Sequence, residues 1–116
     1  MHKLNKLKIW QKAVDLAVKV YEATEKFPRE ETYGLTSQIR RAVVSIASNI
    51  AEGAGRNSRK EFVRFLAISN GSAYELQTQV IISNKLGLMN DEIMKPLLCL
   101  IEEIQKMNYG LQNALR

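Results

Sequence analysis

The chain has 116 residues, enough for one hydrophobic core but not for two. Hydrophobic residues make up 46% and charged residues 25%, which excludes disorder, and no apolar run reaches the roughly 20 residues that span a bilayer. The net charge of +5 is concentrated in the first half, since residues 1–19 carry five lysines and one aspartate. This favours a polyanionic partner, although a merely solvated lysine-rich face would have the same composition.

Apolar residues recur at helical spacing from the start of the chain. We expect a first helix over residues 8–26, ended by Phe27-Pro28, because a residue before proline is pushed out of the helical region. The residues expected on its inward stripe are Trp10, Ala13, Val14, Ala17, Tyr21 and Thr24.

A second helix is expected over residues 33–52, with Gly53 as a left-handed C-cap. Spaced at about 100° per residue, one set of apolar side chains forms a core face. This face comprises Leu35, Ile39, Ala42, Val43, Ile46 and Ile50. Polar residues cover much of the remaining surface, so we predict that this helix and the next also contact another subunit. The residues predicted at that interface are Gln38, Arg41, Ser45, Asn49, Glu52 and Glu75.

The third helix is expected over residues 58–86, because Ser58-Arg59-Lys60-Glu61 is a capping box and Gly87 ends the pattern. Gly71, in its middle, suggests a close helix–helix contact. The predicted seam comprises Phe62, Phe65, Leu66, Ser69, Ala73, Leu76, Val80 and Ser83.

The fourth helix is expected over residues 91–115 after an Asn90 cap, with a loose first turn and a restart near Pro96. Its predicted stripe comprises Leu97, Leu100, Ile101, Ile104, Met107, Leu111 and Leu115. No segment alternates with a period of two residues. The fold class is therefore all-α, with residues 1–116 forming a single domain, an up-down-up-down antiparallel four-helix bundle.

No pattern typical of a catalytic or metal site is present. The only histidine, His2, lies at a chain terminus, and the only cysteine, Cys99, points away from the predicted seam. We expect Glu52, Glu61 and Glu75 to pair with nearby arginines rather than to act as acid and base. The protein is therefore expected to be non-enzymatic, to need no metal or cofactor, and to be cytoplasmic.

The basic residues are the stronger functional signal. Arg56, Arg59, Lys60 and Arg64 flank the loop before the third helix, where they could bind the backbone of a structured RNA or another nucleic acid. Two alternatives stay open at this point. Arg40 and Arg41 could pair with acidic side chains at a subunit interface or contact a ligand, and the protein could be a structural or adaptor oligomer that binds a protein and no nucleic acid.

Several segments together resemble a known family. They are Phe27-Pro28-x-Glu30, Tyr33-Gly34-Leu35-Thr36-Ser37-Gln38-Ile39-Arg40-Arg41, Ser45-Ile46-x-x-Asn49-Ile50-Ala51-Glu52-Gly53, Gly55-Arg56, Phe65-Leu66 and Gly71-Ser72-x-x-Glu75-Leu76. The chain resembles the bacterial four-helix-bundle proteins encoded in 23S rRNA intervening sequences. That family is also similar to the accessory protein of diversity-generating retroelements, a basic homopentamer that binds RNA and a reverse transcriptase. The resemblance implies a cytoplasmic, homopentameric, RNA-binding bundle, and it does not imply an enzymatic activity.

Overall fold

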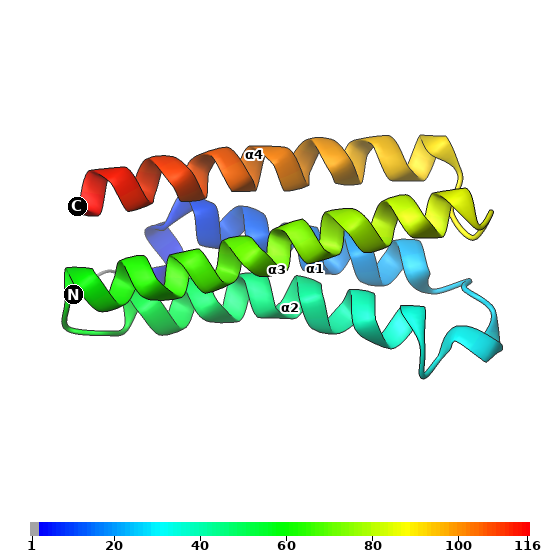
Figure 1. Ribbon diagram of the computed structural model, residues 1–116, viewed down its shortest axis with the longest axis horizontal. Coiled ribbons are helices and arrows are strands. Elements are labelled where there is room, and N and C mark those ends of the chain that lie inside the picture. Colours follow the sequence, from blue (N-terminus) through cyan, green and yellow to red (C-terminus); the bar gives the residue numbers. More distant parts are fainter. Residues whose placement is uncertain (1–2) are drawn as a thin grey trace.

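The computed structural model describes residues 3–116. They form the helices α1 (Lys8–Thr24), α2 (Leu35–Ala54), α3 (Arg59–Lys85) and α4 (Asp91–Leu115), with short 3₁₀ turns at η1 (Leu4–Lys6) and η2 (Arg29–Glu31). Figure 1 shows successive helices running in opposite directions along one long axis, and α4 also packs against α1. The all-α four-helix bundle is confirmed, and the described residues contain no strand. None of their helices is both long and apolar enough to cross a bilayer.

Aliphatic side chains from all four helices fill the core. Each helix turns one stripe inward, and burial of that apolar area stabilises the bundle. The largest fully buried side chains are Phe62, Leu16, Ile39, Ile46, Ile50, Leu66, Leu76, Ile101, Ile104, Val20, Val43 and Val80. The predicted core face of α2 is confirmed except at Leu35, which is half-buried, and the predicted seam of α3 is confirmed with Gln79 as a further buried member.

The inward stripe of α1 differs from the predicted one. Its buried residues are Ile9, Ala13, Leu16, Val20 and Thr24. Of the predicted residues, Ala13 and Thr24 are buried and Trp10 and Ala17 pack against the core as half-buried side chains, whereas Tyr21 is exposed. Apolar residues cover more than one face of this helix. The aliphatic face lies inward because a buried Trp N–H or Tyr O–H would need a hydrogen-bond partner in the core.

Helix α4 begins at Asp91 and continues through Pro96, so the predicted loose turn and restart are wrong. The start is fixed by Asn90, whose Oδ1 accepts a hydrogen bond from the amide of Ile93 at 2.9 Å. Pro96 removes only the bond to the carbonyl of Glu92. Both residues are exposed, so water can satisfy that carbonyl and the helix accommodates the proline in its second turn.

Two helical glycines have environments opposite to the predicted ones. Gly53 is not a left-handed C-cap: it lies inside α2, where an added Cβ would be 2.8 Å from the Cβ of Phe65 and 2.9 Å from Cδ1 of Phe62. Gly71 is exposed, and an added Cβ would meet nothing within 4 Å. The close contact expected at Gly71 is therefore found at Gly53. Gly87 has a φ of 78° and follows the last turn of α3, as predicted.

Candidate nucleic-acid interface

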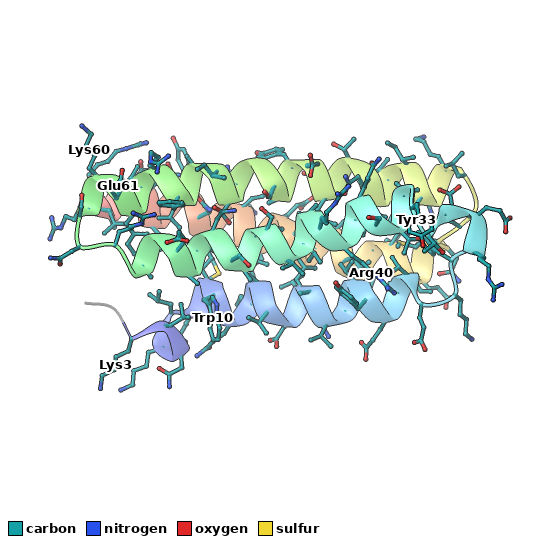
Figure 2. The ribbon with its side chains drawn as sticks, turned by 90° about the horizontal axis from the view of Figure 1, so that it is seen from below. Lys3, Trp10, Tyr33, Arg40, Lys60 and Glu61 are labelled. Carbon is teal, nitrogen blue, oxygen red and sulfur yellow. The ribbon has the colours of Figure 1, made fainter. Side chains whose placement is uncertain are left out.

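The four basic residues predicted to bind nucleic acid lie at one end of the bundle. Arg56 follows the last turn of α2, and Arg59, Lys60 and Arg64 occupy the first two turns of α3. Figure 2 shows Lys60 and Lys3 at the same end, and Figure 1 shows that the C-terminus lies there too. The alternating helix directions thus bring cations from the beginning, middle and end of the chain to one end.

Arg116 also joins this cluster, although it was not among the predicted site residues. Arg116 lines an open groove of about 310 Å³ together with Arg59, Lys60, Val63 and Leu115. The topology holds the signal for it, because the last helix of an up-down-up-down bundle ends beside the loop between the second and third helices. Within residues 3–116, none of the three cations in this groove forms an ion pair.

The remaining two predicted cations are held against an aromatic ring. The guanidinium groups of Arg56 and Arg64 lie 5.0 and 4.7 Å from the centroid of Phe65, within cation–π range. Arg56 also pairs with Glu52 at 3.4 Å, and Arg64 with Glu61 at 3.2 Å. These pairs are exposed, so they orient the arginines without contributing much stability. Two of the predicted carboxylate–arginine pairs are therefore confirmed.

Glu75, the third carboxylate expected to pair with an arginine, behaves differently. It is exposed on α3 and pairs with none of the residues 3–116, so that prediction is wrong within this chain. Gln38 and Arg41 are likewise exposed on α2. Their predicted role in a subunit interface, and that of Glu75, stays a prediction.

Several of the polar side chains of α2 form hydrogen bonds within the bundle. The hydroxyls of Ser45 and Ser72 are 2.9 Å apart, and Nδ2 of Asn49 donates to the carbonyl oxygen of Ser45 at 2.9 Å. Deeper between the helices, the buried Ser69 hydroxyl donates to the carbonyl of Ile46 at 2.8 Å. Ser45 and Asn49 are half-buried where α2 packs on α3, so their polar groups have partners inside the bundle.

Arg40 links α2 to α1 rather than pairing with a carboxylate. Its Nε donates to Oγ1 of Thr24 at 3.0 Å, and its NH2 donates to the carbonyl of Tyr21 at 3.3 Å. The guanidinium group also lies 4.5 Å from the centroid of the Tyr21 ring. Pairing of Arg40 with Glu52 or Glu75 does not occur within the chain.

A buried polar ladder in α4 lies among the predicted apolar side chains, all of which belong to the core or pack against it. Asn108 and Gln112 are buried, whereas Met107, Leu111 and Leu115 are only half-buried. The inward positions continue the spacing of Ile101 and Ile104, and this spacing is the signal that could have identified the two polar residues.

The ladder connects the core to the end of the bundle that carries Arg59, Lys60 and Arg116, here called the cationic end. Nδ2 of Asn108 donates to the carbonyl of Leu66 on α3 at 2.9 Å, and Nε2 of Gln112 donates to Oδ1 of Asn108 at 2.7 Å. The guanidinium group of Arg116 then donates to Oε1 of Gln112 at 3.3 Å. The last cation of the chain is thus oriented by hydrogen bonds that begin at a core carbonyl.

Other chemistry-bearing side chains are dispersed. Within residues 3–116, no group of three or more His, Cys, Asp or Glu could hold a metal ion, and Cys99 is exposed. His2 lies outside the described residues. That the protein needs no metal or cofactor stays a prediction.

The chain matches known proteins in two kinds of comparison, one against family models and one against solved structures. The family model described as "23S rRNA-intervening sequence protein" matches residues 5–110. Among solved structures, the chain is similar to a protein of unknown function from the S23 ribosomal protein family of Bacteroides thetaiotaomicron, with a TM-score of 0.81 and 21% identity. That match covers 90% of this chain and 97% of the other, and at this identity it shows the shared fold alone. No match was found among curated proteins.

Proposed function

Because the chain belongs to the family of 23S rRNA-intervening sequence proteins, we propose that it is a non-enzymatic, cytoplasmic bacterial bundle that binds structured RNA as a homo-oligomer. The observation that carries this proposal is the convergence of Arg59, Lys60 and Arg116 at the cationic end of the bundle. The resemblance to the pentameric accessory protein of diversity-generating retroelements supports five copies in the assembly.

Arg59 and Lys60, at the cationic end, are available to bind phosphates. Arg59 and Lys60 are exposed in the first turn of α3 and have no carboxylate partner within residues 3–116. Contact with RNA phosphates would release counterions, and this release is the main source of sequence-independent affinity. The backbone amides at the start of α3 add to the same attraction.

The remaining features of this end favour recognition of RNA backbone and shape. Arg56 and Arg64 are already positioned over Phe65, so ordering them against a phosphate costs less side-chain entropy. The rings of Phe62 and Phe65 are buried and offer no platform on which unpaired bases could stack. We therefore expect binding to depend on salt and on RNA structure more than on base sequence.

Removing the two unpaired cations tests this proposal. We expect Arg59→Ala with Lys60→Ala to weaken binding of a structured RNA about tenfold or more at moderate salt, and to reduce the slope of log affinity against log salt by about two. Filter binding or fluorescence anisotropy across a salt series measures both quantities.

A charge-matched control separates local contact from net charge. Lys85→Ala with Lys95→Ala removes the same charge from exposed positions at the opposite end of the bundle, and should leave both affinity and slope nearly unchanged. An equal loss in the two double variants would contradict a defined RNA interface. If the unaltered protein fails to bind RNA even at low salt, the alternative of a structural or adaptor oligomer with a protein partner is favoured.

Assembly is a separate prediction. Light scattering after size-exclusion chromatography should give a mass of five times the 13.2 kDa chain mass at micromolar concentration. Glu75→Arg, at an exposed position of α3 without an intrachain partner, should lower that mass, because a like or unpaired charge disfavours a desolvated contact. A monomeric unaltered protein would contradict the proposed assembly.

A further inference from the structure

A second cationic groove lies away from the proposed RNA interface. It is an open groove of about 620 Å³ between the end of α1 and the first turns of α2, lined by Tyr21, Thr36, Ser37, Arg40 and Arg41 among others. Figure 2 shows Arg40 toward the end of the bundle opposite to Lys60. Its volume falls within the range of about 300–1,000 Å³ typical of small-molecule sites.

The charged side chains lining this groove all have one sign. Two arginines line it, and no carboxylate does. Arg40 is already oriented by Thr24 and Tyr21, whereas Arg41 is exposed and forms no ion pair with residues 3–116. A fixed and a free guanidinium together present several N–H donors to an anion.

The start of α2 adds further donors. The cap residue Gly34 has no side chain, and the carboxylate of Glu31 accepts only the amide of Leu35, at 3.3 Å. The next two amides, of Thr36 and Ser37, have no acceptor among residues 3–116, as is general for the first turn of a helix.

Thr36, which also lines the groove, carries a hydroxyl group that is unpaired within residues 3–116. Its hydroxyl oxygen is shielded from solvent, yet it has no hydrogen-bond partner among the described residues. Such groups are rare because an unpaired buried hydroxyl costs about 1–3 kcal/mol. Thr36 is half-buried and lines the groove, and its shielded hydroxyl would reach a bound anion only after the side chain rotates.

We propose that this groove binds a phosphate monoester. Two guanidinium groups in a groove that no carboxylate lines favour a dianion over a singly charged carboxylate, and a phosphate monoester carries about −1.5 to −2 charges at neutral pH. Tyr21 and Val44 line the same groove and can cover an organic group such as a nucleoside. The same chemistry is found in a free nucleotide and in the 5′-phosphate end of an RNA. The groove shares no residue with the proposed RNA interface, but it includes Arg41 and Ser45, which a bound ligand requires to be free of the predicted subunit interface.

Titration of the full ¹⁵N-labelled chain with AMP tests it. We expect saturable shifts that are largest at the amides of Thr36 and Ser37, with a Kd below about 1 mM. Arg41→Gln should weaken this binding about tenfold, and Thr36→Val, which keeps the side-chain shape, should weaken it less. Arg59→Gln, at the other end, should leave the titration unchanged, and adenosine should give no saturable shift.

Two further measurements separate the possible sources and occupants. With the Arg59→Ala, Lys60→Ala variant, tighter binding of a 5′-phosphorylated than of a 5′-hydroxyl oligoribonucleotide would identify an RNA end as ligand, whereas equal binding would identify a free nucleotide. Unchanged AMP affinity in Arg41→Gln, or shifts centred on Arg56–Lys60, would overturn the proposal. An absent AMP response, with a lower assembly mass for Arg41→Gln, would assign the groove to a second copy of the chain and also overturn it.

Discussion

Gly53→Ala is expected to destabilise the bundle by about 3 kcal/mol, although alanine favours a helix over glycine by about 1 kcal/mol. The added methyl group would lie 2.8 Å from the Cβ of Phe65 and 3.3 Å from the backbone oxygen of Phe62. Neither atom can rotate away, so α2 and α3 must separate along their contact. Urea denaturation followed by far-UV circular dichroism measures the change.

Gly71→Ala is the matched control, because it makes the same substitution in a helix without a new contact. An added Cβ there meets nothing within 4 Å, so only the gain in helix propensity remains, about 1 kcal/mol of stabilisation. The two variants should therefore shift the urea midpoint in opposite directions. Shifts of the same sign would show that the packing at Gly53 is looser than the structure indicates.

The Gly53 variant also links packing to the proposed interface. The ring of Phe65, which the new methyl group would displace, holds the guanidinium groups of both Arg56 and Arg64. A shift of this ring changes the positions of two cations without changing the net charge. RNA affinity should fall under conditions where the variant remains folded, while Gly71→Ala should bind RNA as the unaltered protein does.

These glycines also show where sequence reasoning succeeds and where it stops. Periodicity correctly identified the inward faces of α2 and α3, although both helices also expose large apolar side chains such as Val44 and Ile68. A glycine's role depends instead on what the neighbouring helix places opposite it, and this cannot be read from spacing. The prediction for α1 failed differently, because it placed the stripe at Trp10, Ala17 and Tyr21, one position after the buried residues Ile9, Leu16 and Val20.

The candidate site was likewise only partly predictable from the sequence. Arg56, Arg59, Lys60 and Arg64 are close in sequence, so their clustering was predictable from the loop and the capping box. Arg116 joins them only through the return of α4 along the bundle. The contacts of Arg40 with Thr24 and the Tyr21 carbonyl depend equally on which helices are neighbours.

Asn108→Leu is expected to destabilise the protein by about 2 kcal/mol, although it places an apolar side chain at a buried position. The change removes the hydrogen bond to the Leu66 carbonyl and leaves Nε2 of Gln112 buried without its acceptor. An unpaired buried donor costs about 1–3 kcal/mol, which exceeds the gain from added apolar burial at a position that is already 1% exposed. Chemical denaturation measures this loss.

The double variant Asn108→Leu with Gln112→Met separates the two contributions. Replacing both partners by apolar groups leaves no unpaired donor, so most of the lost stability should return, with a favourable coupling of about 1–2 kcal/mol between the sites. Arg116 nevertheless loses the Gln112 oxygen that orients it. RNA affinity should therefore stay reduced while stability recovers. Additive losses in the double variant would contradict a connected ladder, and full recovery of RNA binding would remove Arg116 from the interface.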